Sequence, residues 1–218
     1  MRELTPSVSV TSLSPLRSLL FDFGGTWDSA YRVILAVRIR PALIVVFALV
    51  CGAAASSAAK ESAMRISSSA FAANAAIPSQ FTCEGADRSP PLAFAEIPAG
   101  TKSLALIVED PDAPDPSAPK MTWVHWVLYD MPPQTTGLTE AIAPRELPPG
   151  TLEGLNDWKR TGYRGPCPPI GRHRYFHKLY ALDTVLPNLH NPTKAALEKA
   201  IHGHILAQAE WVGTYQKK

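Results

Sequence analysis

Prolines divide this chain into short segments, and they constrain its fold more than any other feature. The sequence has 21 prolines among 218 residues. Because proline cannot donate a backbone hydrogen bond, it ends strands and favours turns. Many short strands separated by proline turns predict a mainly β, antiparallel domain. The apolar runs of strand length between these turns lie at 92–97, 103–109, 123–129, 174–183 and 205–215.

Three segments refine this prediction. The run from Ser103 to Glu109 is apolar without alternation, which predicts a strand covered on both faces. Residues 134–159 show no clear period and contain several prolines and glycines, so we predict mainly surface loop there. Asn191-Pro192 predicts the start of one helix, with Asn191 as the N-cap and Pro192 at the first helical position.

The first part of the chain has the layout of a secretory signal. Arginines precede an apolar run at 41–50, and small residues follow as far as Ala59, as at a signal cleavage site. We predict that 1–59 is an N-terminal extension with a cleaved signal around 33–59, and that 60–218 is one exported domain, periplasmic or secreted. The run is shorter than the about 20 residues of a membrane span, so we expect no stable span. The true translation start stays open.

Charge balance excludes one class of partner. From Lys60 onward the chain has 16 Lys plus Arg and 16 Asp plus Glu, so its net charge is zero with neutral histidines. Binding to nucleic acid requires a basic face that displaces counterions, and we expect no such partner. Lys159, Arg160 and Arg164 are predicted to be solvated loop charges that can help to attract an anion.

Two cysteines, Cys83 and Cys167, remain after the predicted cleavage. An exported protein meets an oxidising compartment, where disulfides form and persist. A disulfide between these two residues is therefore one hypothesis. Two separately buried thiols are the other.

Two proline-stiffened loops each lead into a strand that carries a histidine. The sequences are Asp110-Pro111-Asp112-Ala113-Pro114 followed by Trp123-Val124-His125-Trp126, and Gly162-Tyr163-Arg164-Gly165-Pro166-Cys167-Pro168-Pro169 followed by Gly171-Arg172-His173-Arg174-Tyr175. Alternate residues of a strand point to the same face. We therefore predict one pocket built from two segments, with Trp123, His125, Val127 and Tyr129 on one strand face and His173, Tyr175, His177 and Leu179 on another.

At these motifs the chain resembles the phosphatidylethanolamine-binding protein family, also called Raf kinase inhibitor-like, and in particular its bacterial branch. The resemblance extends from about Met64 to Tyr215. It implies an antiparallel sandwich of two β-sheets with one or two small peripheral helices. It also implies a shallow pocket at one end for a phosphate-containing anion or a phospholipid headgroup. The residues that it places there are Asp110, Pro114, Trp123, His125, Pro169, His173 and Tyr175.

These residue types suit an anion site. Protonated histidine donates from both ring nitrogens and tyrosine donates from its hydroxyl, so His125, His173 and Tyr175 can bind three anion oxygens. Asp110 is expected to accept a hydrogen bond from one histidine and to favour its charged form. We predict that affinity for a phosphomonoester rises as pH falls through about 6.5. His177 stands where the family usually has an apolar aromatic, and we expect it to pack.

We therefore expect an exported, non-catalytic protein that binds a small ligand and uses no cofactor or metal. A zinc site at His125, His173 and His177 is disfavoured because structural zinc usually takes four nitrogen or sulfur ligands. One alternative is a phosphoester hydrolase that uses the same pocket, although no nucleophile elbow, phosphate-binding loop or metalloprotease helix motif is present.

A second alternative is a regulator of a protease or kinase that acts through the pocket rim. Lys218 follows the last predicted strand directly, so we do not expect the C-terminal helix of eukaryotic relatives. Kinase inhibition is less expected for that reason. The natural ligand and a homodimeric state stay open.

Overall fold

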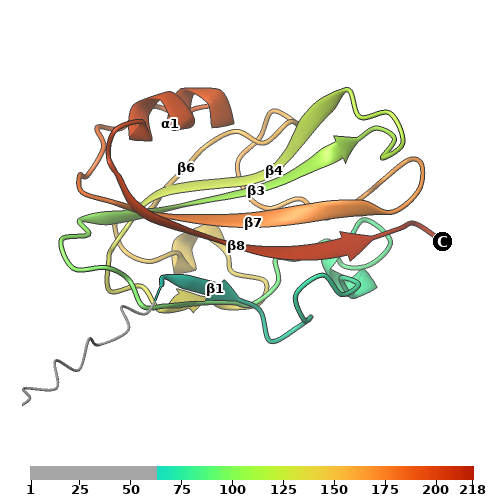
Figure 1. Ribbon diagram of the computed structural model, residues 1–218, viewed down its shortest axis with the longest axis horizontal. Helices are drawn as coiled ribbons and strands as arrows, with labels where there is room; N and C mark the ends of the chain where they lie inside the picture. The colour runs from blue at the N-terminus through green and yellow to red at the C-terminus, as the bar shows by residue number, and fades with distance from the viewer. Residues whose placement is uncertain (1–62) are drawn as a thin grey trace, which may run out of the picture. The chain divides into compact units, whose positions relative to one another are not determined.

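The computed structural model describes residues 63–218 and shows two antiparallel β-sheets (Figure 1). The predicted signal and the boundary predicted after residue 59 lie outside the described residues. The larger sheet has the strand order β6 (Leu152–Glu153), β4 (Met121–Met131), β3 (Ser103–Ala113), β7 (His173–Leu182), β8 (Ile205–Tyr215). The smaller sheet has the order β1 (Arg65–Ser67), β2 (Leu92–Ala95), β5 (Gly137–Leu138). All neighbouring strands are antiparallel, which confirms the predicted two-sheet β architecture.

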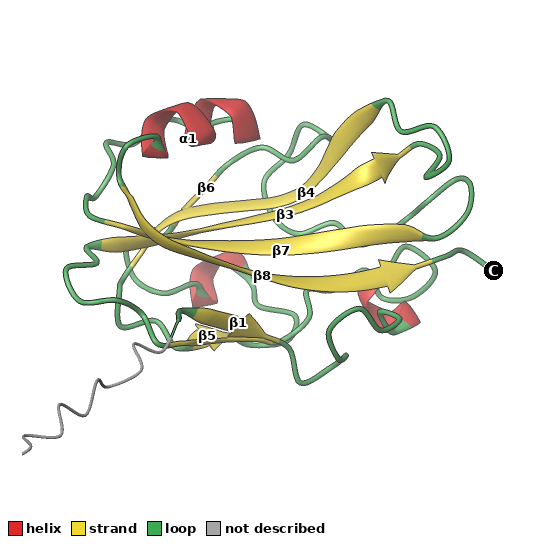
Figure 2. Cartoon of the chain, viewed as in Figure 1, coloured by secondary structure: helices red, strands yellow, loops and turns green. Residues whose placement is uncertain are grey.

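Short helices lie at the periphery of the sheets (Figure 2). They are the 3₁₀ helices η1 (Ser79–Phe81) and η2 (Pro144–Glu146) and the α-helix α1 (Lys194–Ile201). The predicted start of α1 is wrong by two residues, because Thr193 is the N-cap and its hydroxyl accepts from the backbone N–H of Ala196. The reason is tertiary: Leu155 donates its N–H to the carbonyl of Pro192, at 2.8 Å, and forms a bridge with Thr193, which is extended. Asn191 has a φ of 56°, which does not suit an N-cap residue.

Strand β3 is at the centre of the larger sheet and is buried on both faces, as its unbroken apolar sequence predicted. Leu104 and Leu106 belong to the core between the two sheets. Ala105 and Ile107 belong to a second core, which Leu197 and Ile201 of α1 complete on the opposite face. Each fully buried large aliphatic side chain stabilises the fold by about 1.5–3 kcal/mol. The larger sheet is therefore a rigid layer between two apolar cores.

A β-bulge in β4 changes which face its histidine occupies. Val108 pairs with Trp126 and the next residue of β3 pairs with Val124, so His125 is an extra residue in β4. A bulge of this kind interrupts the alternation of side chains. His125 consequently contacts Tyr175, with 5.2 Å between ring centroids, whereas Val127 packs in the core beneath α1.

We predicted that one face of this strand carries Trp123, His125, Val127 and Tyr129. That prediction is wrong beyond the bulge, because Val127 and Tyr129 lie in the core beneath α1. On β7 the alternation holds. Its odd-numbered residues His173, Tyr175, His177 and Leu179 are all buried.

His177 packs in the protein interior, as expected. Its ring lies 5.8 Å from that of Phe71 between centroids, and its Nδ1–H donates to the carbonyl of Trp211 at 3.2 Å. The other ring nitrogen, Nε2, is buried without a hydrogen-bond partner among the described residues. Burial lowers the pKa of His177 to about 4, because the charged ring would lose its hydration.

Replacing His177 with Phe should remove much of the acid sensitivity of the fold. Histidine in the unfolded chain gains a proton below about pH 6.5, whereas His177 in the folded protein gains it only below about 4. Between these values the unfolded state binds more protons, so acidification lowers the free energy of unfolding, by about 3 kcal/mol in total. Urea unfolding should show similar stability for both proteins near neutral pH. At the acidic end of this range, the variant should be more stable by about 3 kcal/mol.

The control for this experiment is His202→Phe, which changes an exposed histidine. That variant should lose stability on acidification as the original protein does. An unchanged pH dependence in His177→Phe would contradict the assignment.

Candidate functional site

The two sequence motifs meet at one end of the larger sheet. Here β3 ends beside the start of β4, with Ala113 paired to Met121, and β7 begins beside the end of β8, with His173 paired to Tyr215. A cavity of about 380 Å³ opens at this end. The residues that line it are Asp110, Ala113, Pro114, Met121, Trp123, His125, Trp158, Cys167, Pro168, Pro169 and His173.

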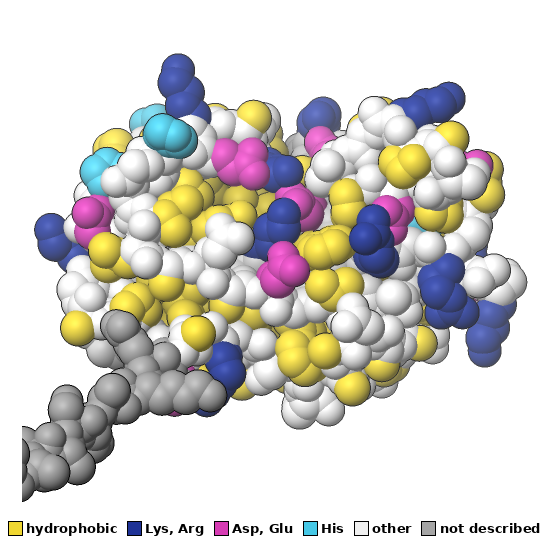
Figure 3. Space-filling model, in the orientation of Figure 1, with side chains coloured by type: hydrophobic (Ala, Val, Ile, Leu, Met, Phe, Trp, Pro, Cys, Tyr) yellow, Lys and Arg dark blue, Asp and Glu magenta, His cyan; other side chains and the backbone are white. Residues whose placement is uncertain are grey.

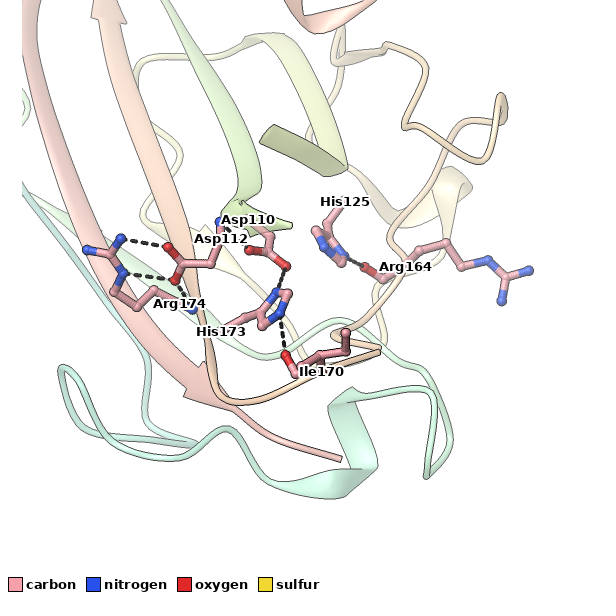
Figure 4. A network of polar contacts seen from close by, with 7 residues as sticks. All are labelled: Asp110, Asp112, His125, Arg164, Ile170, His173 and Arg174. Carbon is pink, nitrogen blue, oxygen red and sulfur yellow. Dashed lines mark hydrogen bonds and ion pairs between the residues drawn. The ribbon is translucent and has the colours of Figure 1, made fainter. Parts of the chain in front are cut away.

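Asp110 and His173 form a buried pair beside this cavity (Figure 4). The Nδ1 of His173 lies 2.7 Å from Oδ2 of Asp110, and the two side chains are 0% and 5% exposed. The other carboxylate oxygen of Asp110 accepts from the backbone N–H of Asp112 at 2.8 Å. Asp110 therefore accepts from a histidine, in the geometry that the sequence suggested.

Both ring nitrogens of His173 face protein oxygens. Nδ1 faces Asp110, and Nε2 lies 2.9 Å from the carbonyl oxygen of Ile170 (Figure 4). Only the doubly protonated ring can donate to both oxygens. Its positive charge then balances the carboxylate of Asp110, and no ring N–H remains for a ligand. In this arrangement His173 shapes the cavity wall and does not donate to an anion.

His125 has a free ring nitrogen. Its Nδ1 donates to the carbonyl oxygen of Arg164 at 2.6 Å, and its buried Nε2 has no hydrogen-bond partner among the described residues. Burial lowers the pKa of His125 below its usual value, although the Arg164 carbonyl opposes this effect. At neutral pH the ring therefore holds one proton on Nδ1 and presents the Nε2 lone pair. Of the two motif histidines, His125 is the one that can bind a ligand directly.

Tyr175 is 1% exposed and lies behind the cavity wall rather than in it. Its ring contacts that of His125 and stacks on that of His173, with 6.5 Å between the latter centroids. Its hydroxyl is buried without a hydrogen-bond partner among residues 63–218. Burial and the nearby carboxylate of Asp110 raise the pKa of this hydroxyl, so it stays protonated and can donate.

Trp158 is a cavity residue that the sequence analysis missed, because it lies in the segment predicted as surface loop. Its ring contacts those of Trp123 and His125 edge-on, at 5.4 and 5.2 Å between centroids. Two preceding residues hold it: Asn156 Oδ1 accepts from the Trp158 N–H, and Asp157 Oδ2 accepts from the N–H of Val124. An Asx turn before a tryptophan in a polar loop was the available signal.

The second motif loop is fastened to the segment around Phe81 and Asp87. Arg164 pairs with Asp87 at 2.6 Å, so it is not simply a solvated charge, and the Gly165 N–H donates to the same carboxylate. A Cβ on Gly165 would lie 2.2 Å from the carbonyl oxygen of Phe81, so any larger residue at this position would clash with the backbone. The Tyr163 hydroxyl donates to that carbonyl. These contacts position the Arg164 carbonyl that orients His125.

A disulfide joins Cys83 to Cys167 across 84 positions of sequence, which confirms the first of the two cysteine hypotheses. Both residues are exposed, and Cys167 belongs to the cavity lining. The backbone N–H of Cys83 also donates to the carbonyl of Pro166. The disulfide therefore anchors the loop that forms one wall of the cavity.

Residues 63–218 contain no group of three or more His, Cys, Asp or Glu side chains arranged to hold a metal ion. In the same part of the chain, no helix is both long and apolar enough to cross a membrane.

Comparison with known proteins gives consistent matches. The family model for phosphatidylethanolamine-binding protein matches residues 67–216. A UPF0098 protein of Methanothermobacter thermautotrophicus is 45% identical over 155 residues, which cover 71% of this chain and 99% of that protein. A UPF0098 protein of Chlamydia pneumoniae is 46% identical over 154 residues, which cover 71% and 99%.

Two solved structures share the fold. A phosphatidylethanolamine-binding protein homolog from Chlamydia trachomatis has a TM-score of 0.66 and 42% identity, and the match covers 72% of this chain and 99% of that one. YbcL of E. coli, described as a new member of the mammalian PEBP family, has a TM-score of 0.65 and 30% identity, with 72% and 100% covered. The chain therefore belongs to the phosphatidylethanolamine-binding protein family.

Proposed function

We propose that this protein is exported and binds a small phosphate-bearing anion at His125, without converting it. The observation that carries the proposal is that His125 lines the cavity with Nδ1 held by the Arg164 carbonyl, while its buried Nε2 has no hydrogen-bond partner among the described residues. The ring of Tyr175 contacts the ring of His125. Its buried hydroxyl lies close to the carboxylate of Asp110 and has no hydrogen-bond partner of normal geometry among the described residues. Buried polar groups normally have hydrogen-bond partners, and exceptions often mark functional sites.

His125 can bind a phosphate oxygen in two ways. In its neutral form, Nε2 accepts from the O–H of a protonated phosphate group. In its charged form, Nε2 donates to an anionic oxygen, which is the stronger interaction. The cavity gains positive charge when His125 takes a proton. Binding should therefore be modest at neutral pH and stronger in acid.

The cavity walls indicate an ester rather than bare phosphate. Pro114, Met121, Trp123, Trp158 and Pro169 give an apolar lining around the few polar groups. Such pockets bind ligands by apolar contact and use the polar groups for orientation. A phosphomonoester or a phospholipid headgroup fits such a pocket, because its organic part can contact the apolar walls while its phosphate binds the polar groups.

One observation supports binding without turnover, and another supports export. Acid–base catalysis of phosphoester hydrolysis needs groups that can exchange protons with the substrate, and both nitrogens of His173 are already bound to protein oxygens. The exposed Cys83–Cys167 disulfide suits an oxidising compartment outside the cytosol.

Sulfate is a useful probe because its charge stays constant over this pH range. We expect its affinity, measured by calorimetry, to rise as pH falls below about 6.5, approaching tenfold per pH unit until His125 is protonated. The rise should continue to lower pH than for an ordinary histidine, because burial lowers the pKa of His125. His125→Phe should bind sulfate weakly at every pH.

The matched control is His202→Ala, which removes an exposed histidine and should leave the sulfate profile unchanged. Sulfate binding in His125→Phe equal to that of the original protein would refute the proposed site. Release of phosphate from a panel of phosphomonoesters, lost in His173→Ala, would instead establish an enzyme.

A further inference from the structure

Two large apolar side chains are exposed at the rim of the cavity. Met121 is 52% exposed and belongs to the cavity lining. Ile170 is 56% exposed and follows Pro169 of the lining, and its carbonyl binds His173 (Figure 4). Met121 is the first residue of β4, and Ile170 lies in the loop before β7. The segments that precede and follow them touch, because a Cβ on Gly171 would lie 3.0 Å from the ring of Pro116. Met121 and Ile170 therefore form one apolar rim around the mouth.

Basic side chains surround this rim. Exposed Lys120 precedes Met121, and exposed Arg172 follows Ile170 by two positions. Arg172 also shares a hollow with Lys217 and Lys218 at the end of β8. In Figure 3, dark blue Lys and Arg side chains gather beside yellow hydrophobic ones at the end of the molecule where the chain terminates.

Of the nearby acidic groups, only Asp112 is paired with a cation, Arg174. Asp115 and Glu84 keep their negative charge, because their hydrogen bonds come from neutral donors. The exposed side chains of Lys120, Arg172, Lys217 and Lys218 outnumber these two carboxylates, so the side-chain charge close to the apolar rim is positive on balance.

We propose that this rim docks on the surface of an anionic phospholipid bilayer, with Met121 and Ile170 inserted among the headgroups and the basic side chains against the anionic lipids. Apolar side chains in a basic surround are the usual pattern of interfacial membrane binding. Trp123 and Trp158 in the same cavity add aromatic side chains of the kind found at membrane interfaces. The proposal concerns the rim and is separate from anion binding at His125.

A bilayer fits this surface better than a protein partner does. A stable protein interface buries about 800 Å² on each partner around a well-packed apolar centre. The rim instead offers two exposed apolar side chains, one at the start of β4 and one in the loop before β7, with exposed Lys and Arg side chains beside them. Lysine and arginine near an anionic membrane gain from its surface potential without a matched partner for each charge.

The purified protein is mixed with vesicles of phosphatidylcholine, with and without phosphatidylglycerol, and the bound fraction is measured by co-sedimentation. We expect binding to the mixed vesicles at low salt, and a several-fold loss at high salt because salt screens surface charge. Met121→Ser with Ile170→Ser should reduce the partition coefficient about tenfold or more, since less apolar surface is inserted. Lys120→Gln with Arg172→Gln should reduce it as high salt does.

The control pair is Val185→Ser with Leu206→Ser, which removes two other exposed apolar side chains, 61% and 44% exposed. Leu206 lies near the start of β8, at the opposite end of the β7–β8 pair from the cavity. This variant should bind vesicles as the original protein does, and thermal unfolding should show that all variants fold.

Several outcomes would overturn the proposal: no vesicle binding, equal binding to uncharged vesicles, or an equal loss in the control pair. Vesicle binding and sulfate binding are separate readouts. A protein that binds sulfate but not vesicles refutes only the docking surface, and one that binds vesicles but not sulfate refutes only the pocket.

Discussion

Asp110→Asn should lower the free energy of unfolding by about 4 kcal/mol, because removing one partner of a buried ion pair leaves the other charge uncompensated. The Asp110 side chain is 5% exposed and that of His173 is fully buried, with 2.7 Å between Oδ2 and Nδ1. Asparagine keeps the size of the side chain but not its charge, so the buried ring of His173 loses its carboxylate partner. Urea unfolding at neutral pH measures the loss.

The chain contains an exposed pair of the same type that serves as a control. His204 and Asp183 lie 2.8 Å apart, with both side chains about half exposed. Water screens such a pair, so Asp183→Asn should cost less than about 1 kcal/mol. If Asp110→Asn costs no more than Asp183→Asn, the buried pair does not carry the stability assigned to it. In addition, Asp110→Asn should cost less when His173 has already been replaced by Phe.

Removing the Cys83–Cys167 disulfide should also cost about 4 kcal/mol, because the bond closes a long loop and so restricts the unfolded chain. The two cysteines are 84 positions apart, which places the loop near the upper end of the usual effect. We expect Cys83→Ser with Cys167→Ser to lower the free energy of unfolding by this amount. The measurement is urea unfolding with and without a thiol reductant.

Reduction provides the matched test. Because both cysteines are exposed, a reductant should lower the stability of the original protein to that of the double variant and leave the double variant unchanged. Unchanged stability of the original protein after verified reduction would contradict the prediction. The cavity wall formed by Cys167 should also loosen, so sulfate affinity should fall on reduction.

Most of the fold followed from local sequence patterns. The unbroken apolar run of β3 and the aromatic and β-branched runs of β4 and β7 each became a strand of the larger sheet. Prolines and polar loops separated them as predicted. The start of α1 was missed because Leu155 makes long-range backbone contacts with Pro192 and with Thr193, which is extended. Local capping preferences do not include such contacts.

The residues of the candidate site could be predicted only in part from the sequence. Six of the seven residues predicted there line the cavity, namely Asp110, Pro114, Trp123, His125, Pro169 and His173. Tyr175 lies behind the wall, and Trp158 could not be placed because its loop has no periodic pattern. The role expected of His173 as an anion donor does not fit its two occupied nitrogens.

The sequence by itself predicted that two proline-containing segments lead into strands with histidines and that Asp110 accepts a hydrogen bond from one of these histidines. The prediction of the first segment as a loop was wrong, because Asp110 to Ala113 continue strand β3. Only the tertiary structure decided that the partner is His173, and that a bulge changes the face of His125, whose Nε2 has no hydrogen-bond partner within residues 63–218. The physical reason is that residue type and spacing specify which hydrogen bonds a side chain can make. Strand register and loop packing specify which of them are already made within the protein, and therefore which remain for a ligand.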